Sequence, residues 1–238
     1  MLLEVAGLKK SFGSIIVADA LDLAVAPGEA VGIIGPNGAG KTTLFNLIAG
    51  GLAPSAGHIR FDGSDLAGVS RQRRCRAGIG RTHQIPQPFE NLTVFENLLV
   101  GAVHGRRNSE REVAQSCGEI LERLGLVRRA NALAGSLTLL ERKRLEMARA
   151  LATAPRLLLL DEIAGGLTEG ECAELVATIG DIHRSGVAIL WIEHVVHALL
   201  VVIDRLVVLN FGRKIAEGEP REVMRRPDVH QIYIGIEA

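Results

Sequence analysis

The stretch AVGIIGPNGAGKTT, residues 30–43, decides the fold of this 238-residue chain. Its first five residues are a continuous apolar run, which is typical of a β-strand buried on both faces of a sheet. Directly after them, Gly35 to Thr42 follow the pattern G-x-x-x-x-G-K-T, and the next segment, LFNLIAG, has a helical pattern that Gly50 and Gly51 close. A glycine loop between a buried strand and a helix is the context that a phosphate-binding loop requires.

The residue types of this loop suit phosphate groups. Glycines let backbone N–H groups close around the β- and γ-phosphates of a nucleotide, because a Cβ would block that approach. The helix that begins near Lys41 adds the positive end of its dipole, Lys41 supplies a compact charge, and the Thr42 hydroxyl can ligate Mg²⁺. A glycine-rich turn without a ligand would match the bare pattern but not its setting. The predicted nucleotide-binding residues here are Gly35, Pro36, Asn37, Gly38, Ala39, Gly40, Lys41, Thr42 and Thr43.

Titratable side chains follow two further buried strands. RLLLL (residues 156–160) leads to Asp161 and Glu162, and His194 comes just after VAILWI. Ligands of open α/β sheets bind at the carboxyl ends of the strands, so we expect these side chains beside the glycine loop. Asp161 would hold Mg²⁺, directly or through water, and Glu162 would orient and polarise the attacking water. A solvated acidic strand end and a structural histidine are the alternatives.

Composition excludes several classes of protein. Lys and Arg number 27, as do Asp and Glu, so the net charge of zero argues against a nucleic-acid partner. The basic run RQRRCR (residues 71–76) is predicted to be a solvated helix face. Three scattered cysteines suit a reducing compartment. The longest uncharged apolar stretch near the C-terminus, residues 194–203, is far shorter than the roughly 20 residues of a spanning helix, so any membrane role must come through a partner.

The pattern along the chain indicates strands around an inserted helical part. LLEVAGL and IIVADALDLAV are expected to be strands with a turn at SFGS between them. From about Thr93 to Ala134 the segment is charged, helical and poor in strands, and its TVFE start is a capping box; TEGE, from Thr168, begins another helix. This order predicts an α/β core with an inserted helical subdomain.

These features, in this order in a chain of this length, resemble the ATP-binding cassette of ABC transporters over essentially the whole chain. The resemblance implies one ABC ATPase domain, residues 1–238. Its P-loop NTPase core (1–91 and 155–238) would hold a parallel sheet plus N-terminal antiparallel strands, and its helical subdomain would lie at about 92–154. ATP and Mg²⁺ are the implied cofactors. Gln84 matches the glutamine loop, which senses Mg²⁺ and the γ-phosphate and contacts the membrane partner, and Phe12 matches the aromatic residue that stacks on adenine.

Finer features resemble the ATPase subunits of branched-chain amino acid uptake systems. They are GIGRTHQ, ENLTVFENL, RLEMARAL and the tail VLNFGRKIAEGEPREVMRRPDVHQIYIG. This resemblance implies a motor that energises uptake of branched-chain amino acids or a related small polar solute. It would dock on integral membrane permease subunits at the cytoplasmic face of the inner membrane, beside a second cassette and, indirectly, a periplasmic solute-binding protein. An export motor of the lipopolysaccharide-transport type and a soluble non-transport ABC ATPase are the alternatives.

The chain departs from the family pattern at its signature. Anchored by RLEMARAL, the family's Leu-Ser-Gly-Gly-Gln falls on Leu137, Thr138, Leu139, Leu140 and Glu141. In the family this signature closes over ATP held by the opposite subunit. We expect Thr138 to cap the following helix and Leu139 and Leu140 to lie in the loop before it. Leucine is bulky and disfavours positive φ, so both residues should loosen the approach of this loop to the γ-phosphate. The sequence thus predicts a different cassette as partner, unless both leucines turn outward. Two smaller departures are Ile163, where Pro is usual, and Thr168, where Asp or Asn is usual.

Overall fold

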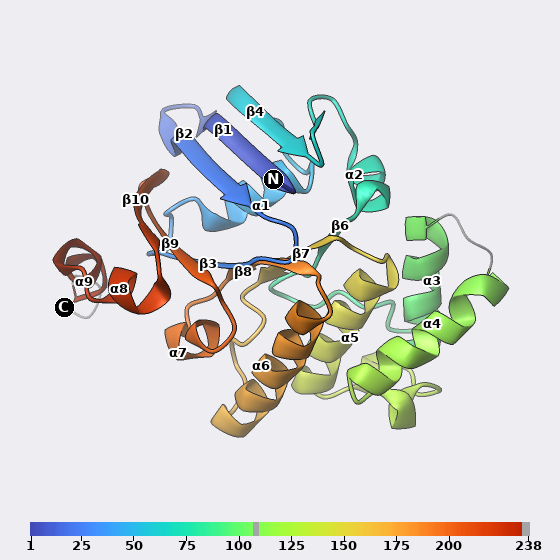
Figure 1. Cartoon of the computed structure of the whole chain (residues 1–238). Coiled ribbons are helices and arrows are strands. Elements are labelled where there is room, and N and C mark those ends of the chain that lie inside the picture. Colours follow the sequence, from blue (N-terminus) through green and yellow to red (C-terminus); the bar gives the residue numbers. More distant parts are fainter. Residues whose placement is uncertain (107–109, 235–238) are drawn as a thin grey trace.

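The computed structural model describes residues 1–106 and 110–234 and confirms the predicted α/β class (Figure 1). Residues 107–109, inside the predicted helical subdomain, and 235–238, which include the final glycine of the tail quoted above, lie outside the described residues. Along the described ranges, no helix combines the length and the apolar character needed to cross a bilayer.

The strands form two sheets. An antiparallel sheet of order β2-β1-β4-β5 contains β1 (Leu3–Phe12), β2 (Ile15–Val25), β4 (Ala56–Phe61) and β5 (Ser64–Asp65). A second sheet of order β10-β9-β3-β8-β7-β6 contains β3 (Ala30–Ile34), β6 (Ile79–Arg81), β7 (Leu157–Asp161), β8 (Ala188–Ile192), β9 (Arg205–Asn210) and β10 (Arg213–Gly218). Its pairs are parallel except β9 with β10, so the carboxyl ends of β3, β8 and β7 lie next to one another.

Helices lie on both faces of the second sheet. They are α1 (Lys41–Ile48), α2 (Arg71–Ala77), α3 (Val94–Arg106), α4 (Glu110–Arg123), α5 (Leu139–Ala152), α6 (Glu169–Arg184), α7 (Val196–Leu200), α8 (Pro220–Met224) and α9 (Pro227–Ile234). In Figure 1, α1 lies between the two sheets, and α5, α6 and α7 lie beyond the second sheet. The helices α3 and α4 pack beside α5.

The core follows the period-2 pattern of the buried strands. Val31 and Ile33 pack in the cluster that holds α1 and the antiparallel strands, whereas Ala30 and Ile34 pack with α5, α6 and α7. Every residue of β3, β7 and β8 is buried, which is why their sequences are apolar apart from Asp161 at the end of β7. The polar ends of these strands are therefore fixed on a rigid support.

Capping boxes begin three of the helices. Glu96 accepts a hydrogen bond from the backbone N–H of Thr93 at 2.7 Å, and its own N–H donates to the Thr93 hydroxyl at 3.1 Å. The same reciprocal pair joins Thr168 to Glu171 at the start of α6, as TEGE predicted. A third joins Thr138 to Glu141 at the start of α5.

That third box corrects the prediction for the two signature leucines. Leu139 and Leu140 are the first two residues of α5 and do not lie in the preceding loop. The Thr138 hydroxyl accepts from the N–H of Glu141, and the Glu141 carboxylate accepts from the N–H of Thr138, so the helix begins directly after Thr138. Both leucines therefore have helical backbone, and a demand for positive φ does not arise.

The solvated helix face predicted for residues 71–76 is wrong for one of its arginines. Arg74, on α2, is only 5% exposed. Its guanidinium donates to the carbonyl oxygens of Leu47, Ile48, Leu66 and Val69 at 2.7–2.9 Å. A buried charge that satisfies its donors in this way holds neighbouring loops together and is not available to a partner.

Candidate functional site

The glycine loop joins β3 to α1 and is closely enclosed. Gly35 has φ 153°, and a Cβ there would lie 2.1 Å from the carbonyl oxygen of Leu209. Gly40 has φ 99°, and a Cβ there would lie 2.2 Å from the carbonyl oxygen of Val17. At Gly38, by contrast, a Cβ would meet nothing within 4 Å. The backbone is thus held on one side by β9 and β2 and has open space on the other, as a cradle for phosphate needs.

Lys41 begins α1 and turns its side chain into this loop. It is 5% exposed, and its ammonium donates to the carbonyl oxygens of Gly35 at 2.7 Å and Pro36 at 3.0 Å. Burial lowers the pKa of Lys41, and the charges of Glu162 and Asp161 oppose that shift. Of the remaining loop residues, Ala39 is buried, Pro36 and Thr43 are partly buried, and Asn37 and Thr42 are exposed. The first turn of α1 therefore brings a cation, a hydroxyl and helix-end N–H groups to the loop.

Asp161, the last residue of β7, is 2% exposed. Its Oδ2 accepts from Arg81 Nη2 at 2.9 Å, while Arg81 Nη1 donates to Asn46 Oδ1 on α1 at 2.7 Å. Burial raises the pKa of Asp161, and the bond from Arg81 works against that rise. Asp161 Oδ1 is buried and has no hydrogen-bond partner among the described residues. A carboxylate with one oxygen anchored and the other unused fits a ligand of Mg²⁺.

Glu162 brings together the other predicted catalytic groups. Its Oε1 lies 2.9 Å from His194 Nε2, and its Oε2 accepts a hydrogen bond from Gln84 Nε2. The backbone of Glu162 has φ 46°, in the left-handed region, and its N–H donates to the carbonyl of Ile192 at 2.9 Å. Such a conformation is costly for a residue other than glycine and persists only where the surroundings fix it. Gln84, Glu162 and His194 therefore converge from three segments that are distant in sequence.

Phe12 ends β1, at the turn into β2. Its side chain is 48% exposed, and the Lys10 ammonium lies 5.1 Å from the centre of its ring. An exposed ring beside a cation is consistent with the predicted stacking on adenine but is not specific to it.

The five signature residues are divided between core and surface. Leu137 is 5% exposed, Leu140 packs partly against the core, and Leu139 is 45% exposed. The outward orientation considered for both leucines therefore applies to Leu139 alone. The carboxylate of Glu141 serves the capping box through Oε2, which lies 2.9 Å from the Thr138 nitrogen, and its Oε1 lies 2.7 Å from Arg129 Nε. The start of α5 thus carries an anionic group of its own.

Sequence reasoning missed three charged residues around this site, of which Glu193 and Lys143 are buried and Arg81 is partly buried. Arg81 holds Asp161, as described above. Glu193 accepts hydrogen bonds from backbone N–H groups, and Lys143 donates to the carbonyl of Glu162 at 3.4 Å. One signal was available for Glu193, because a charged residue that directly continues a fully buried strand must find partners.

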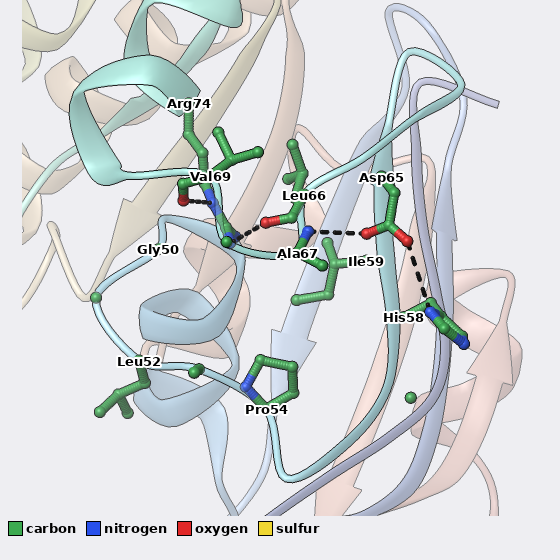
Figure 2. A pocket seen from close by; sticks show the side chains of 14 residues that line it. Gly50, Leu52, Pro54, His58, Ile59, Asp65, Leu66, Ala67, Val69 and Arg74 are labelled. Atoms are coloured by element: carbon green, nitrogen blue, oxygen red, sulfur yellow. Dashed lines mark hydrogen bonds and ion pairs between the residues drawn. The ribbon is translucent and has the colours of Figure 1, made fainter.

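A depression of about 450 Å³ lies elsewhere, between β4, β5, α2 and the loop after α1 (Figure 2). Figure 2 shows Arg74 donating to Val69 and Leu66 on one side and His58 beside Asp65 on the other. None of the predicted site residues lines it. Its polar groups are engaged with one another and with backbone, so the candidate site remains the loop and strand ends.

The chain resembles known proteins in sequence and in fold. The family model described as "ABC transporter" matches residues 18–165. The high-affinity branched-chain amino acid transport ATP-binding protein BraF of Pseudomonas aeruginosa is 38% identical, with 98% of each chain covered. The high-affinity branched-chain amino acid transport ATP-binding protein LivG of Escherichia coli K12 is 37% identical, with 98% of each chain covered. The crystal structure of an ATP-binding cassette of an ABC transporter in its ADP conformation superposes with a TM-score of 0.90 at 33% identity, covering 98% of both chains.

Proposed function

This chain belongs to the ABC transporter family, and from that premise we propose that it is the ATP-hydrolysing subunit of an importer for branched-chain amino acids or a related small polar solute. The likeness to BraF and LivG along nearly the whole chain supports an uptake motor. The observation that carries the proposal is the convergence of Gln84, Glu162 and His194 beside the Lys41 loop.

ATP would bind with its phosphates in the glycine loop. Backbone N–H groups around Gly38 and the Lys41 ammonium would hold the β- and γ-phosphates, and Phe12 would stack on adenine. The Thr42 hydroxyl, Gln84 and the free oxygen of Asp161 would hold Mg²⁺. When bound, Mg²⁺ would neutralise charge that develops on the transferred phosphoryl group.

Glu162 would act as the general base. Held between Gln84 and His194, its carboxylate would accept a proton from water as the water oxygen attacks the γ-phosphorus and ADP leaves. His194 would contact the γ-phosphate and fix the direction in which Glu162 points. The charge of Glu162 works against the lowering of the Lys41 pKa, so the proposed base lies within electrostatic reach of the phosphate loop.

The signature residues would face ATP on a second cassette, across a head-to-tail dimer. Residues 92–154, as the helical subdomain, would carry that signature and dock on permease subunits at the cytoplasmic face of the inner membrane. Because the Glu141 carboxylate already caps the N-terminal end of α5 and the exposed Leu139 stands where glycine is usual, the approach to the facing γ-phosphate would be weakened. We therefore infer that the second cassette is a different chain with an intact signature.

A titration with a fluorescent ATP analogue tests the assignment of the loop and the histidine. Lys41→Ala removes the phosphate-facing charge and should abolish binding. His194→Ala should leave the affinity for the ATP analogue within about twofold of the parent and slow hydrolysis, because the γ-phosphate is the only part of the nucleotide that His194 is proposed to contact. Equal loss of affinity in both variants would make His194 a structural residue and overturn its proposed role.

Transport by the reconstituted complex tests the unequal partners. Glu162→Gln in this chain should stop transport more completely than removal of the equivalent glutamate of the partner cassette. Equal damage from the two substitutions, or full activity of a homodimer of this chain, would show that the LTLLE signature is catalytically neutral.

A further inference from the structure

Glu193 is a buried carboxylate that the proposed mechanism does not use. It is 2% exposed and lies between the last residue of β8 and His194. Burial raises the pKa of Glu193, and hydrogen bonds from three backbone N–H groups together with the charge of Lys143 oppose that rise. Burying a charged group costs desolvation free energy, so a buried carboxylate normally has a specific set of hydrogen-bonding or charged partners.

The two oxygens of Glu193 serve two different loops. Oε1 accepts from the N–H of Ala164 at 2.6 Å, two residues after Glu162. Oε2 accepts from the N–H of His194 at 3.0 Å and from that of Val195 at 3.4 Å. One carboxylate therefore joins the backbone that carries Glu162 to the backbone that carries His194.

Lys143 provides the cation on the other side. It is 4% exposed, its charge acts on both Glu193 and Glu162, and its ammonium donates to the Glu162 carbonyl at 3.4 Å. Lys143 stands on α5, whose first turn contains the signature leucines. Lys143 thus links the signature helix to the Glu162 loop by a hydrogen bond and acts on Glu193 through its charge.

We propose that Glu193 is a positioning residue for ATP hydrolysis, which fixes the loop of Glu162 relative to the loop of His194. The proposal rests on the proposed function, since it needs both residues to act in hydrolysis. The 2.9 Å separation of Glu162 Oε1 and His194 Nε2 is set by side chains that follow two paired strands. The bond from the Glu162 N–H to the Ile192 carbonyl joins these strands at their ends, whereas Glu193 joins the loops beyond them, at Ala164 and at His194. Loss of this tie should let the two side chains separate while the phosphate loop stays intact.

Glu193→Gln tests this because it keeps the shape but leaves only one accepting oxygen. Whichever way the amide turns, its NH₂ group faces N–H donors of one loop. Turnover should fall about 10- to 100-fold, as expected when a catalytic group is misplaced by about 1 Å. Affinity for a fluorescent ATP analogue should stay within about twofold, because Glu193 does not contact the phosphate loop. Turnover within about threefold of the parent in folded protein would overturn the proposal.

Two further variants separate positioning from folding. Arg74→Met removes a charge that is similarly buried and bonded to backbone, but at the C-terminal end of α1 and the loop before α2 and not at the catalytic loops, so it should lower stability without changing turnover per folded molecule. If Glu193→Gln does not fold, Glu193→Asp takes its place: it keeps two acceptors and the charge opposite Lys143 but is one methylene too short to reach both loops. Its turnover should fall at least about threefold at unchanged affinity, and parental turnover would contradict the proposal.

A double variant identifies the route by which Glu193 acts. In a Glu162→Gln background the base is already lost, so Glu193→Gln should change the residual turnover less than about threefold. A further drop of about tenfold or more would mean that Glu193 does not act through Glu162 and would overturn the inference. If Glu162→Gln and His194→Ala themselves keep parental turnover, the proposed function fails. If they lose turnover while Glu193→Gln keeps it, only the positioning role fails.

Discussion

Removing Arg81 should strongly destabilise the chain, because it leaves the Asp161 carboxylate buried without its cation. The pair is inside the protein: the Arg81 side chain is 12% exposed, that of Asp161 is 2% exposed, and Nη2 lies 2.9 Å from Oδ2. Breaking one partner of such a pair costs about 3–5 kcal/mol. At about 2–4 °C per kcal/mol for a chain of this size, Arg81→Met should lower the melting temperature by roughly 6–20 °C.

Urea unfolding followed by circular dichroism measures this loss, with two controls. Arg213→Met breaks an exposed pair, in which Arg213 is 70% exposed and lies 2.6 Å from Asp19, and should lose less than about 1 kcal/mol. Arg81→Met combined with Asp161→Asn removes the orphaned charge as well and should recover at least about half of the loss. If Arg81→Met alone lowered the free energy of unfolding by less than about 1 kcal/mol, the pair would behave like an exposed ion pair, and the argument from burial would be refuted.

Two further predictions concern the loop and the signature helix. Gly40→Ala places a Cβ 2.2 Å from a carbonyl oxygen of β2 and should abolish binding of an ATP analogue. The control, Gly63→Ala, is also at positive φ but its Cβ would meet nothing within 4 Å, so binding should stay intact. Equal affinities of the two variants would show that the glycine loop moves freely. Although burial alone would raise it, the pKa of Glu141 is lowered by bonds from Thr138 and Arg129. Glu141→Gln should therefore lose about 0.5–1 kcal/mol of unfolding free energy near pH 7, a difference that shrinks as pH falls through the lowered pKa; a loss that does not depend on pH would contradict this reading.

The sequence predicted the parts of this fold that depend on short stretches. Residues 30–34 are a strand because five consecutive apolar residues end at a glycine loop, and the structure gives β3 those same bounds. The capping boxes that begin at Thr93 and Thr168 could also be predicted, because each depends on a pattern of only four residues. The convergence of Glu162 and His194 followed from the rule that ligand groups gather at the carboxyl ends of parallel strands.

What the sequence did not predict depends on partners far apart in the chain. Nothing within RQRRCR distinguishes Arg74 from its neighbours, because its acceptors include carbonyls 26 and 27 residues away. Arg81 and Asp161 are separated by 80 residues. The start of α5 differs from the prediction for another reason. The family's glycine-containing signature indicates a loop at Leu139 and Leu140, whereas Thr138 and Glu141 form a capping box that makes Leu139 helical.

The turnover of Glu162→Gln tests the central claim most directly, namely that this carboxylate is the general base for ATP hydrolysis. The amide is close to isosteric and the side chain is proposed to contact water and not the nucleotide, so affinity for an ATP analogue should stay within about twofold of the parent. Turnover should fall about 10²–10³-fold, the usual effect of losing one preorganised group of this kind. Hydrolysis within about threefold of the parent at unchanged affinity would show that Glu162 is not the base and would contradict the account.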